Sequence, residues 1–415
     1  MRSIILAPFT LIYPKIFFLF FLLVRPIVDF YSYIRLAGSI NLASILTLFL
    51  IILYPLELLK RQKIRLKNSN FMVNFNILFF IFLFISLFSL VYSNNISISL
   101  MDFARLISIL VVFNYVAIYC SNRENPMLLV NVILISSIIP LSFGFYQFVF
   151  VKGGLATPGF NRIYGTFMHP NVFAQYLLLI FFLLLFLLST FKIKKLYRRF
   201  LIFYSLVIIF ALYNTFTRGA WVALLMGVLI FIFLRTKASK KIIHFSLILI
   251  LLLVLSPYLQ KRWEDITRPQ YNQVNSLEWR LNLWRNSVEY LTEHPFIGNG
   301  LGMYEYKTGQ MAHNDYLRIS YETGFLGLLV YMVLLCYILF SSLRNLLRSK
   351  TLFNINRYKI ILCVIVSLLI MGLTDNLARS TLIMIYYFSV INILFNFPKL
   401  KNLEDKVNFR IINNR

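Results

Sequence analysis

The chain has 415 residues, of which 60% are hydrophobic and only 13% are charged, and it carries a formal net charge of +26. An ordinary soluble domain is about 25% charged. So few charges could not cover the apolar surface of a soluble protein of this length. The composition therefore excludes a water-soluble enzyme and a disordered chain, and leaves an integral membrane protein.

Apolar runs long enough to cross a bilayer, about 20 residues each, recur along the whole chain. We expect about twelve transmembrane helices, near residues 6–24, 38–59, 71–92, 98–120, 127–151, 170–191, 200–216, 219–234, 242–258, 320–343, 358–374 and 380–397. The first lacks a small-residue cleavage site, which indicates a retained helix rather than a signal peptide. The helices near 200–216 and 219–234 are short, and either could be tilted or partly re-entrant. The expected fold is an all-α polytopic membrane protein, with residues 1–415 forming a single integral membrane domain.

The basic residues gather on one side of this topology. If the N-terminus is cytoplasmic, most of the 41 Lys and Arg fall in short cytoplasmic loops, such as Lys60–Lys67 and Lys192–Arg199. This distribution follows the positive-inside rule and predicts that both termini are cytoplasmic. The basicity is therefore mostly a topology signal, and we expect no nucleic-acid partner. The cysteines Cys120, Cys336 and Cys363 match neither a disulfide framework nor a metal-ligand spacing.

One outward-facing loop, residues 259–319, separates two strong spans and carries most of the polar residues of the chain. Within it, Ser276–Glu293 repeats apolar residues at helical spacing, with Arg280 and Arg285 beside them. This pattern predicts an amphipathic helix near the outer membrane face. Pro295 and the glycines that follow it are expected to end the helix.

Two arginines stand at the outward ends of spans, where polar residues are costly and therefore functional candidates. Arg162–Asn171 joins an outward loop to the start of a helix, and free backbone N–H groups there favour an anion. Arg162 could add a forked donor to a phosphate, and a glycine turn with an interfacial Arg explains these residues equally well. Arg218 lies between two apolar runs with almost no loop around it. We interpret Arg218 as facing a cavity that holds a pyrophosphate, with snorkelling to the interface as the alternative.

His313 begins the junction between the long loop and the next helix. A neutral His is a base near pH 7 and can accept a proton from a hydroxyl, so His313 is a candidate general base. The alternative is an interfacial or capping His. The remaining histidines rank below it as bases: His169, His244 and His294. Asp375, between the last two spans, could orient a His or pair with Arg379.

Asp102 and Arg105 lie three residues apart near the outward end of the fourth span. Pairing within the helix is the expectation, and substrate contact is the alternative. The first outward loop has no paired acidic motif, and the chain has no Walker motif and no HExxH. Metal, ATP and peptidase chemistry are therefore unsupported, and we expect no metal and no cofactor.

In their order, these clusters resemble the O-antigen ligase and polymerase superfamily of bacterial membrane glycosyltransferases. The matching pieces are Arg162–Asn171, Thr217–Trp221, Arg280–Trp284, His294–Gly302, His313–Gly327 and Gly372–Asp375. They cover roughly residues 140–380, and the twelve-span topology extends the likeness over nearly the whole chain.

The resemblance implies a metal-independent transferase of the bacterial inner membrane with its active site on the periplasmic side. Its partners would be an undecaprenyl-diphosphate-linked glycan donor, a lipid-linked or glycan acceptor, and membrane lipids. Carried over to this chain, His313 would be the base that activates the acceptor hydroxyl and Arg218 would bind the donor diphosphate. The further candidates for substrate binding are Arg162, Arg280, Asn314, Asp375 and Glu322. Attack opposite the leaving group would invert the anomeric centre.

Several functions share this pattern. We expect an O-antigen ligase-like enzyme that delivers glycan to the lipid A-core in lipopolysaccharide biosynthesis. The alternative is an O-antigen or capsule repeat-unit polymerase, and a third is attachment of glycan to protein or to a wall polymer. A polysaccharide flippase is disfavoured, because transporters place such charges near the midplane and often in repeated halves.

Overall fold

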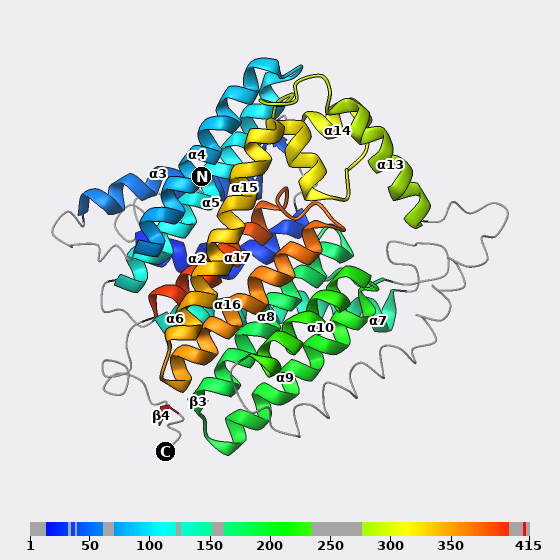
Figure 1. The fold of residues 1–415 in the computed structure, drawn as a ribbon. Coiled ribbons are helices and arrows are strands. Elements are labelled where there is room, and N and C mark those ends of the chain that lie inside the picture. Colours follow the sequence, from blue (N-terminus) through cyan, green and yellow to red (C-terminus); the bar gives the residue numbers. More distant parts are fainter. Residues whose placement is uncertain are drawn as a thin grey trace.

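The computed structural model describes residues 14–31, 35–37, 40–60, 70–121, 126–151, 162–234, 276–397 and 410–411. These residues fold into long helices that pack side by side (Figure 1). A helix bonds its backbone N–H and C=O groups internally, which is what a bilayer requires. In the described part of the chain the only strands are two short antiparallel pairs. They join β1 (Arg35–Ala37) to β2 (Ile40–Asn41) and β3 (Phe191–Lys192) to β4 (Arg410–Ile411).

The helices follow the predicted order. The first group is α2 (Pro14–Val28), α3 (Leu42–Lys60), α4 (Asn70–Ser89), α5 (Ile96–Ser121), α6 (Pro126–Ser136) and α7 (Ile138–Phe150). The second group is α8 (Pro170–Thr190), α9 (Lys195–Asn214), α10 (Arg218–Phe233), α13 (Ser276–Tyr290), α14 (Met303–Thr308), α15 (Asp315–Arg348), α16 (Leu352–Gly372) and α17 (Thr381–Asn396). Single turns of 3-10 helix follow α2 and α4, as η1 (Asp29–Tyr31) and η2 (Leu90–Tyr92).

Within the described ranges, seven helical segments are long and apolar enough to cross a membrane. They are Asn70–Tyr92, Ile96–Cys120, Pro126–Phe150, Pro170–Thr190, Lys195–Asn214, Asp315–Arg348 and Leu352–Gly372. Three shorter apolar helices accompany them: Leu42–Pro55, Arg218–Phe233 and Thr381–Asn396. This confirms an all-α polytopic membrane protein, while the count of twelve spans stays a prediction. The expected span at 242–258 lies outside the described residues, and the one at 6–24 is described only from Pro14.

Two expected spans have different bounds. The helix predicted at 200–216 begins already at Lys195, so it has 20 residues and is long enough to span. The span predicted at 127–151 is divided at Ser137 into α6 and α7. Pro140 explains the division, because it has no N–H to donate to the carbonyl of Ser136.

The centre of the bundle is formed by α8, α16 and α17, which are buried along most of their length. α16 packs against α8, α10 and α15, and α17 packs against α5 and α8. In Figure 1, α13 and α14 lie outside the packed helices, at the end where α15 begins. They come from the predicted outward loop, and the amphipathic helix expected at 276–293 is observed as α13. The part of this loop before Ser276 lies outside the described residues.

α15 is interrupted at Gly324, whose backbone has φ +68° and ψ −176°. The carbonyl groups of residues 321–322 accept hydrogen bonds from the backbone N–H groups of residues 299–300, at 2.9 and 3.0 Å. The N–H groups of residues 325–326 donate to the carbonyls of residues 295–296, at 2.7 and 3.3 Å. A helix break normally leaves such groups unpaired. Here the segment after α13 pairs them on both sides of the break and fixes the first part of α15, which carries the site.

Candidate functional site

Three segments that are distant in sequence meet at one end of the bundle. They are the loop before α8 (residues 162–169), the start of α15 (residues 313–315) and the turn between α16 and α17 (residues 373–380). The backbone N–H of Ala378 donates to Asp315 at 2.8 Å, which ties the second segment to the third. The packing therefore gathers the candidate residues of three separate motifs.

His313 has a left-handed backbone, with φ +49°. This conformation is uncommon for a residue with a side chain, and it persists only where the surroundings hold it. Here the next residue, Asn314, is the N-cap of α15. Its side-chain oxygen accepts from the N–H groups of Tyr316 and Leu317, at 2.9 and 3.2 Å, so Asn314 caps the helix. The cap at Asn314 and the strained backbone of His313 together fix the direction in which the His313 side chain points from the backbone.

The imidazole of His313 lies beside Asp375. Its Nδ1 is 3.7 Å from Oδ1 of Asp375, which is an ion-pair distance rather than a direct hydrogen bond. Asp375 also accepts from Gln175 Nε2 at 3.1 Å and from its neighbour Asn376 N at 2.9 Å. Burial by itself would raise the pKa of Asp375, but His313, His169 and the backbone N–H of Asn376 outweigh it and hold that pKa below its usual value. The carboxylate is thus charged at neutral pH and can orient the imidazole.

Arg162 holds the loop before α8 in place. Its Nε donates to the carbonyl of Thr215 at 2.8 Å, and its terminal nitrogen donates to Asn171 Oδ1 at 2.7 Å and to Thr217 Oγ1 at 3.2 Å. These bonds join the loop to the turn between α9 and α10. Arg162 therefore has a structural role, and its charge is fixed in the site.

Arg280 reaches the same cluster from α13. Burial lowers its pKa and the nearby charge of Asp375 opposes that shift. Its Nε is buried and has no hydrogen-bond partner among the described residues. An unpaired N–H of a buried charged group is costly. The guanidinium of Arg280 is therefore not fully paired by the described residues.

His169 is the N-cap of α8, and its Nδ1 accepts from the N–H of Asn171 at 3.1 Å. Burial lowers the pKa of His169 to about 4; Asp375 opposes the shift, whereas the charges of Arg162, His313 and Arg280 add to it. His169 is therefore neutral at pH 7 with Nδ1 already in use, so its role is to shape the loop.

Arg218 is the first residue of α10 and is half-buried. A Cβ atom on the next residue, Gly219, would lie 2.5 Å from Oγ1 of Thr374, the neighbour of Asp375. The first turn of α10 therefore packs directly against the Asp375 turn. This places a helix N-terminus, which favours an anion, at the edge of the site.

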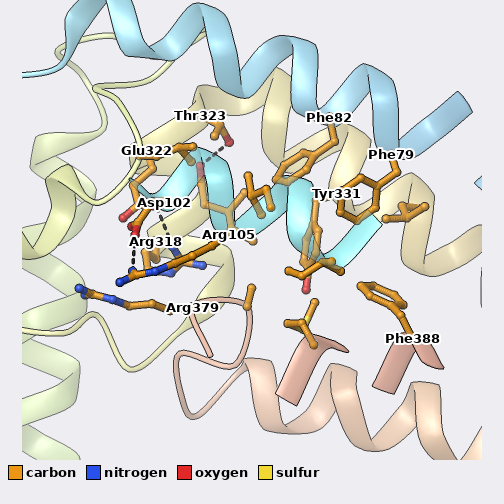
Figure 2. Close-up of a pocket in the computed structure, with 17 residues that line it drawn as sticks. Phe79, Phe82, Asp102, Arg105, Arg318, Glu322, Thr323, Tyr331, Arg379 and Phe388 are labelled. Atoms are coloured by element: carbon orange, nitrogen blue, oxygen red, sulfur yellow. Dashed lines mark hydrogen bonds and ion pairs between the residues drawn. The ribbon is translucent and has the colours of Figure 1, made fainter. Parts of the chain in front are cut away.

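Glu322 lies in a different environment from the other predicted residues. It is buried and pairs with Arg318 at 2.7 Å, and both line a cavity between α4, α5, α15 and α17 (Figure 2). The predicted pair of Asp102 and Arg105 is confirmed on the same cavity. The structure thus brings His313, Asp375, Arg162 and Arg280 together and places Glu322 in a second group.

Sequence reasoning missed Gln175 and Asp315. Gln175 lies one turn after Asn171 in the otherwise apolar α8, and two polar residues at that spacing in an apolar helix could have indicated a polar face. Asp315, Arg318 and Glu322 have the i, i+3, i+7 spacing of an ion-pair series along one helix face. Over the described ranges, no three His, Cys, Asp or Glu residues gather in a way that could hold a metal ion.

The family model described as O-antigen ligase matches residues 203–332. This stretch runs from α9 into α15 and contains Arg218, Arg280 and His313. No curated protein matches the chain. The match supports the resemblance found in the sequence, and the residues that it covers reach both sides of the site.

Proposed function

We propose that this chain, whose residues 203–332 match the O-antigen ligase family model, is a membrane glycosyltransferase that moves a glycan from undecaprenyl diphosphate to an acceptor hydroxyl. We propose the lipid A-core as that acceptor, and the periplasmic face of the inner membrane as the place of reaction. The observation that carries the proposal is the contact of His313 with the charged Asp375, a carboxylate whose field also reaches Arg280.

His313 is the proposed general base. Its Nδ1 faces Asp375, which leaves Nε2 for the acceptor hydroxyl. The side chain is 19% exposed, so a substrate can reach it. A contact of 3.7 Å is typical of a catalytic pair before substrate binds, since such bonds tighten in the complex. Asp375 would stabilise the imidazolium that forms when the proton is taken.

The arginines are the proposed site for the donor diphosphate. As the glycosidic bond breaks, negative charge grows on the phosphate oxygen, and fixed guanidinium groups stabilise it without reorganising. Arg280 offers its free N–H, Arg162 adds a fixed charge, and Arg218 adds its charge and the N-terminus of α10. No metal ion is needed for this step.

The atoms of the proposed step balance. The acceptor oxygen forms a bond to the anomeric carbon, and the bond from that carbon to the phosphate oxygen breaks. The hydroxyl proton goes to His313, and undecaprenyl diphosphate leaves with the electron pair. With the base and the arginines on opposite sides of the sugar, the anomeric centre inverts.

The test is a reconstituted reaction. The purified protein, in detergent with EDTA, receives undecaprenyl-diphosphate glycan and either lipid A-core or carrier-linked repeats. We expect product on lipid A-core that is absent with His313→Ala and retained with the control His294→Ala, whose ring stacks on Tyr92 with centroids 4.0 Å apart. Product only on carrier-linked repeats would make the protein a polymerase. No product with either, together with transfer of the lipid-linked glycan across vesicle membranes, would make it a flippase.

A further inference from the structure

The cavity between α4, α5, α15 and α17 (Figure 2) has a volume of about 40 Å³. One end is lined by charged side chains, those of Asp102, Arg105, Arg318, Glu322 and Arg379. The other end is lined by rings, those of Phe79, Phe82, Tyr331 and Phe388. The proposed transfer step uses none of these residues.

The charged end of this cavity is open and the aromatic end is closed. The side chains of Arg105 and Arg379 are 45% and 26% exposed. By contrast, Phe82 and Phe388 are 5% and 1% exposed. A ligand therefore enters past the charges. A lipid tail, which would enter through apolar walls, does not suit this opening.

The open, charged end of the cavity, here called its mouth, has as many carboxylates as guanidinium groups. Arg105 pairs with Asp102 on α5, and Arg379 pairs with Glu305 on α14. Two carboxylates, which only accept hydrogen bonds, are thus each paired with a guanidinium group, which only donates. Sugar hydroxyls both donate and accept, so such a surface matches a neutral sugar. It differs from the arginine cluster beside His313, whose excess positive charge suits a phosphate.

Inside the mouth, Arg318 has a hydrogen-bond donor without a partner among the described residues. Arg318 is 9% exposed and binds Glu322 at 2.7 Å and Asp315 at 3.5 Å. Its Nε is buried and has no partner among the described residues. A single water needs roughly 10–15 Å³ of such space, so the cavity has room for a hydroxymethyl group. An oxygen there would pair the Nε, whose isolation is costly.

The cavity adjoins the proposed base. Ala378 lines it and donates its N–H to Asp315, two residues after His313. The arginines proposed for the diphosphate lie on α10, on α13 and in the loop before α8. The cavity is instead lined by residues of α4 and α5, as well as by residues of α15 and α17. A donor held by the arginines and an acceptor held at the cavity would then both be near His313, as a displacement reaction requires.

We propose that the mouth formed by Asp102, Arg105 and Arg379, together with Glu305 that pairs with Arg379, is a subsite for the acceptor sugar. The sugar ring lies across the two ion pairs, and one hydroxyl or hydroxymethyl group enters the cavity toward Arg318. This inference rests on the proposed function, because it assigns the acceptor of that reaction a place on the protein.

Two measurements test the subsite. The first is the acceptor KM in the reconstituted reaction for Asp102→Asn, Arg105→Gln and Arg379→Gln, with Arg285→Gln on the exposed face of α13 as control. The second is binding of neutral core oligosaccharide, without donor, by saturation-transfer NMR. We expect the acceptor KM and the dissociation constant to rise about tenfold in the three variants, with the donor KM unchanged. One lost pair of hydrogen bonds gives a change of this size.

The outcomes separate the two proposals. Turnover with the acceptor KM within twofold of wild type in all three folded variants would overturn the subsite and leave the transferase standing. Binding that the three variants weaken, in a protein that transfers nothing, would support the subsite and overturn the transferase. A rise in both KM values would assign the ion pairs to folding alone and overturn the subsite.

Discussion

Gly298 and Gly324 lie with their backbones in contact. A Cβ atom on Gly298 would stand 2.4 Å from the backbone nitrogen of Gly324, and one on Gly324 would stand 2.3 Å from the carbonyl carbon of Phe296. Both glycines have positive φ, +84° and +68°, a region that favours residues without a side chain. Four backbone hydrogen bonds across the break of α15 depend on this approach. The glycine pair therefore holds the helix that begins just after His313.

We predict that Gly298→Ala strongly destabilises the protein. The new Cβ would meet backbone atoms, which cannot move aside as a flexible side chain can, and the cost should exceed about 3 kcal/mol. Gly309→Ala is the matched control: its φ is +67° and nothing lies within 4 Å of the added atom, so only the conformational cost of about 1–2 kcal/mol remains. Thermal unfolding in detergent checks this. Equal losses of stability in the two variants would contradict the contact.

At pH 7, Asp375→Asn should lower kcat about a hundredfold. The reason is that the amide cannot stabilise a positively charged imidazole as a carboxylate does. The low pKa of Asp375 means that its contribution to stability is lost only as the pH falls below about 4. Above pH 5 the variant should therefore unfold with the same pH profile as the wild type. Glu293→Gln, in an exposed pair with Lys307, is the control. Unchanged kcat in Asp375→Asn would show that His313 acts without this partner.

The helical framework could be predicted because a bilayer admits few alternatives to apolar helices of about 20 residues. The break of α15 at Gly324 could not be predicted from the sequence. It depends on hydrogen bonds to residues 295–300, which precede it by a turn, a short helix and a loop. The division of α6 from α7 could have been expected from Pro140, whose effect on the carbonyl of Ser136 is local.

The sequence indicates which residues belong to the candidate site, but not which of them contact one another. The sequence left Asp375 with two partners, a His or Arg379. The structure places it 3.7 Å from His313 and pairs Arg379 with Glu305 instead. Such choices depend on how the turn after α16 meets the start of α15, which no local pattern encodes. Asp102 and Arg105 could be paired in advance, because helical spacing alone brings them together.

The stability of the wild type should fall as the pH drops from about 6.5 to about 4, partly through His169. The folded pKa of His169 is about 4 against 6.5 for the free side chain, so in this range the unfolded chain binds the extra proton. The loss amounts to about 3 kcal/mol at most. His169→Asn keeps a capping oxygen for α8 and cannot titrate here. Its unfolding temperature should fall less than that of the wild type over this range, and parallel curves would disprove the role of His169.

Arg280→Ala should weaken the binding of phosphate more than that of sugar. The unpaired Nε of Arg280 is expected to bind a phosphate oxygen, and a hydrogen bond between charged groups contributes about 1.5–3 kcal/mol. The inhibition constant of inorganic pyrophosphate in the transfer reaction should therefore rise about ten- to a hundredfold, while the acceptor KM stays the same. Arg280→Lys should recover only part of the loss, because an ammonium group lacks the planar fork. Arg285→Ala, five residues further along α13 and exposed, should leave pyrophosphate inhibition unchanged. Equal effects of Arg280→Ala and Arg285→Ala would show that α13 acts through its general positive charge rather than through a bound diphosphate.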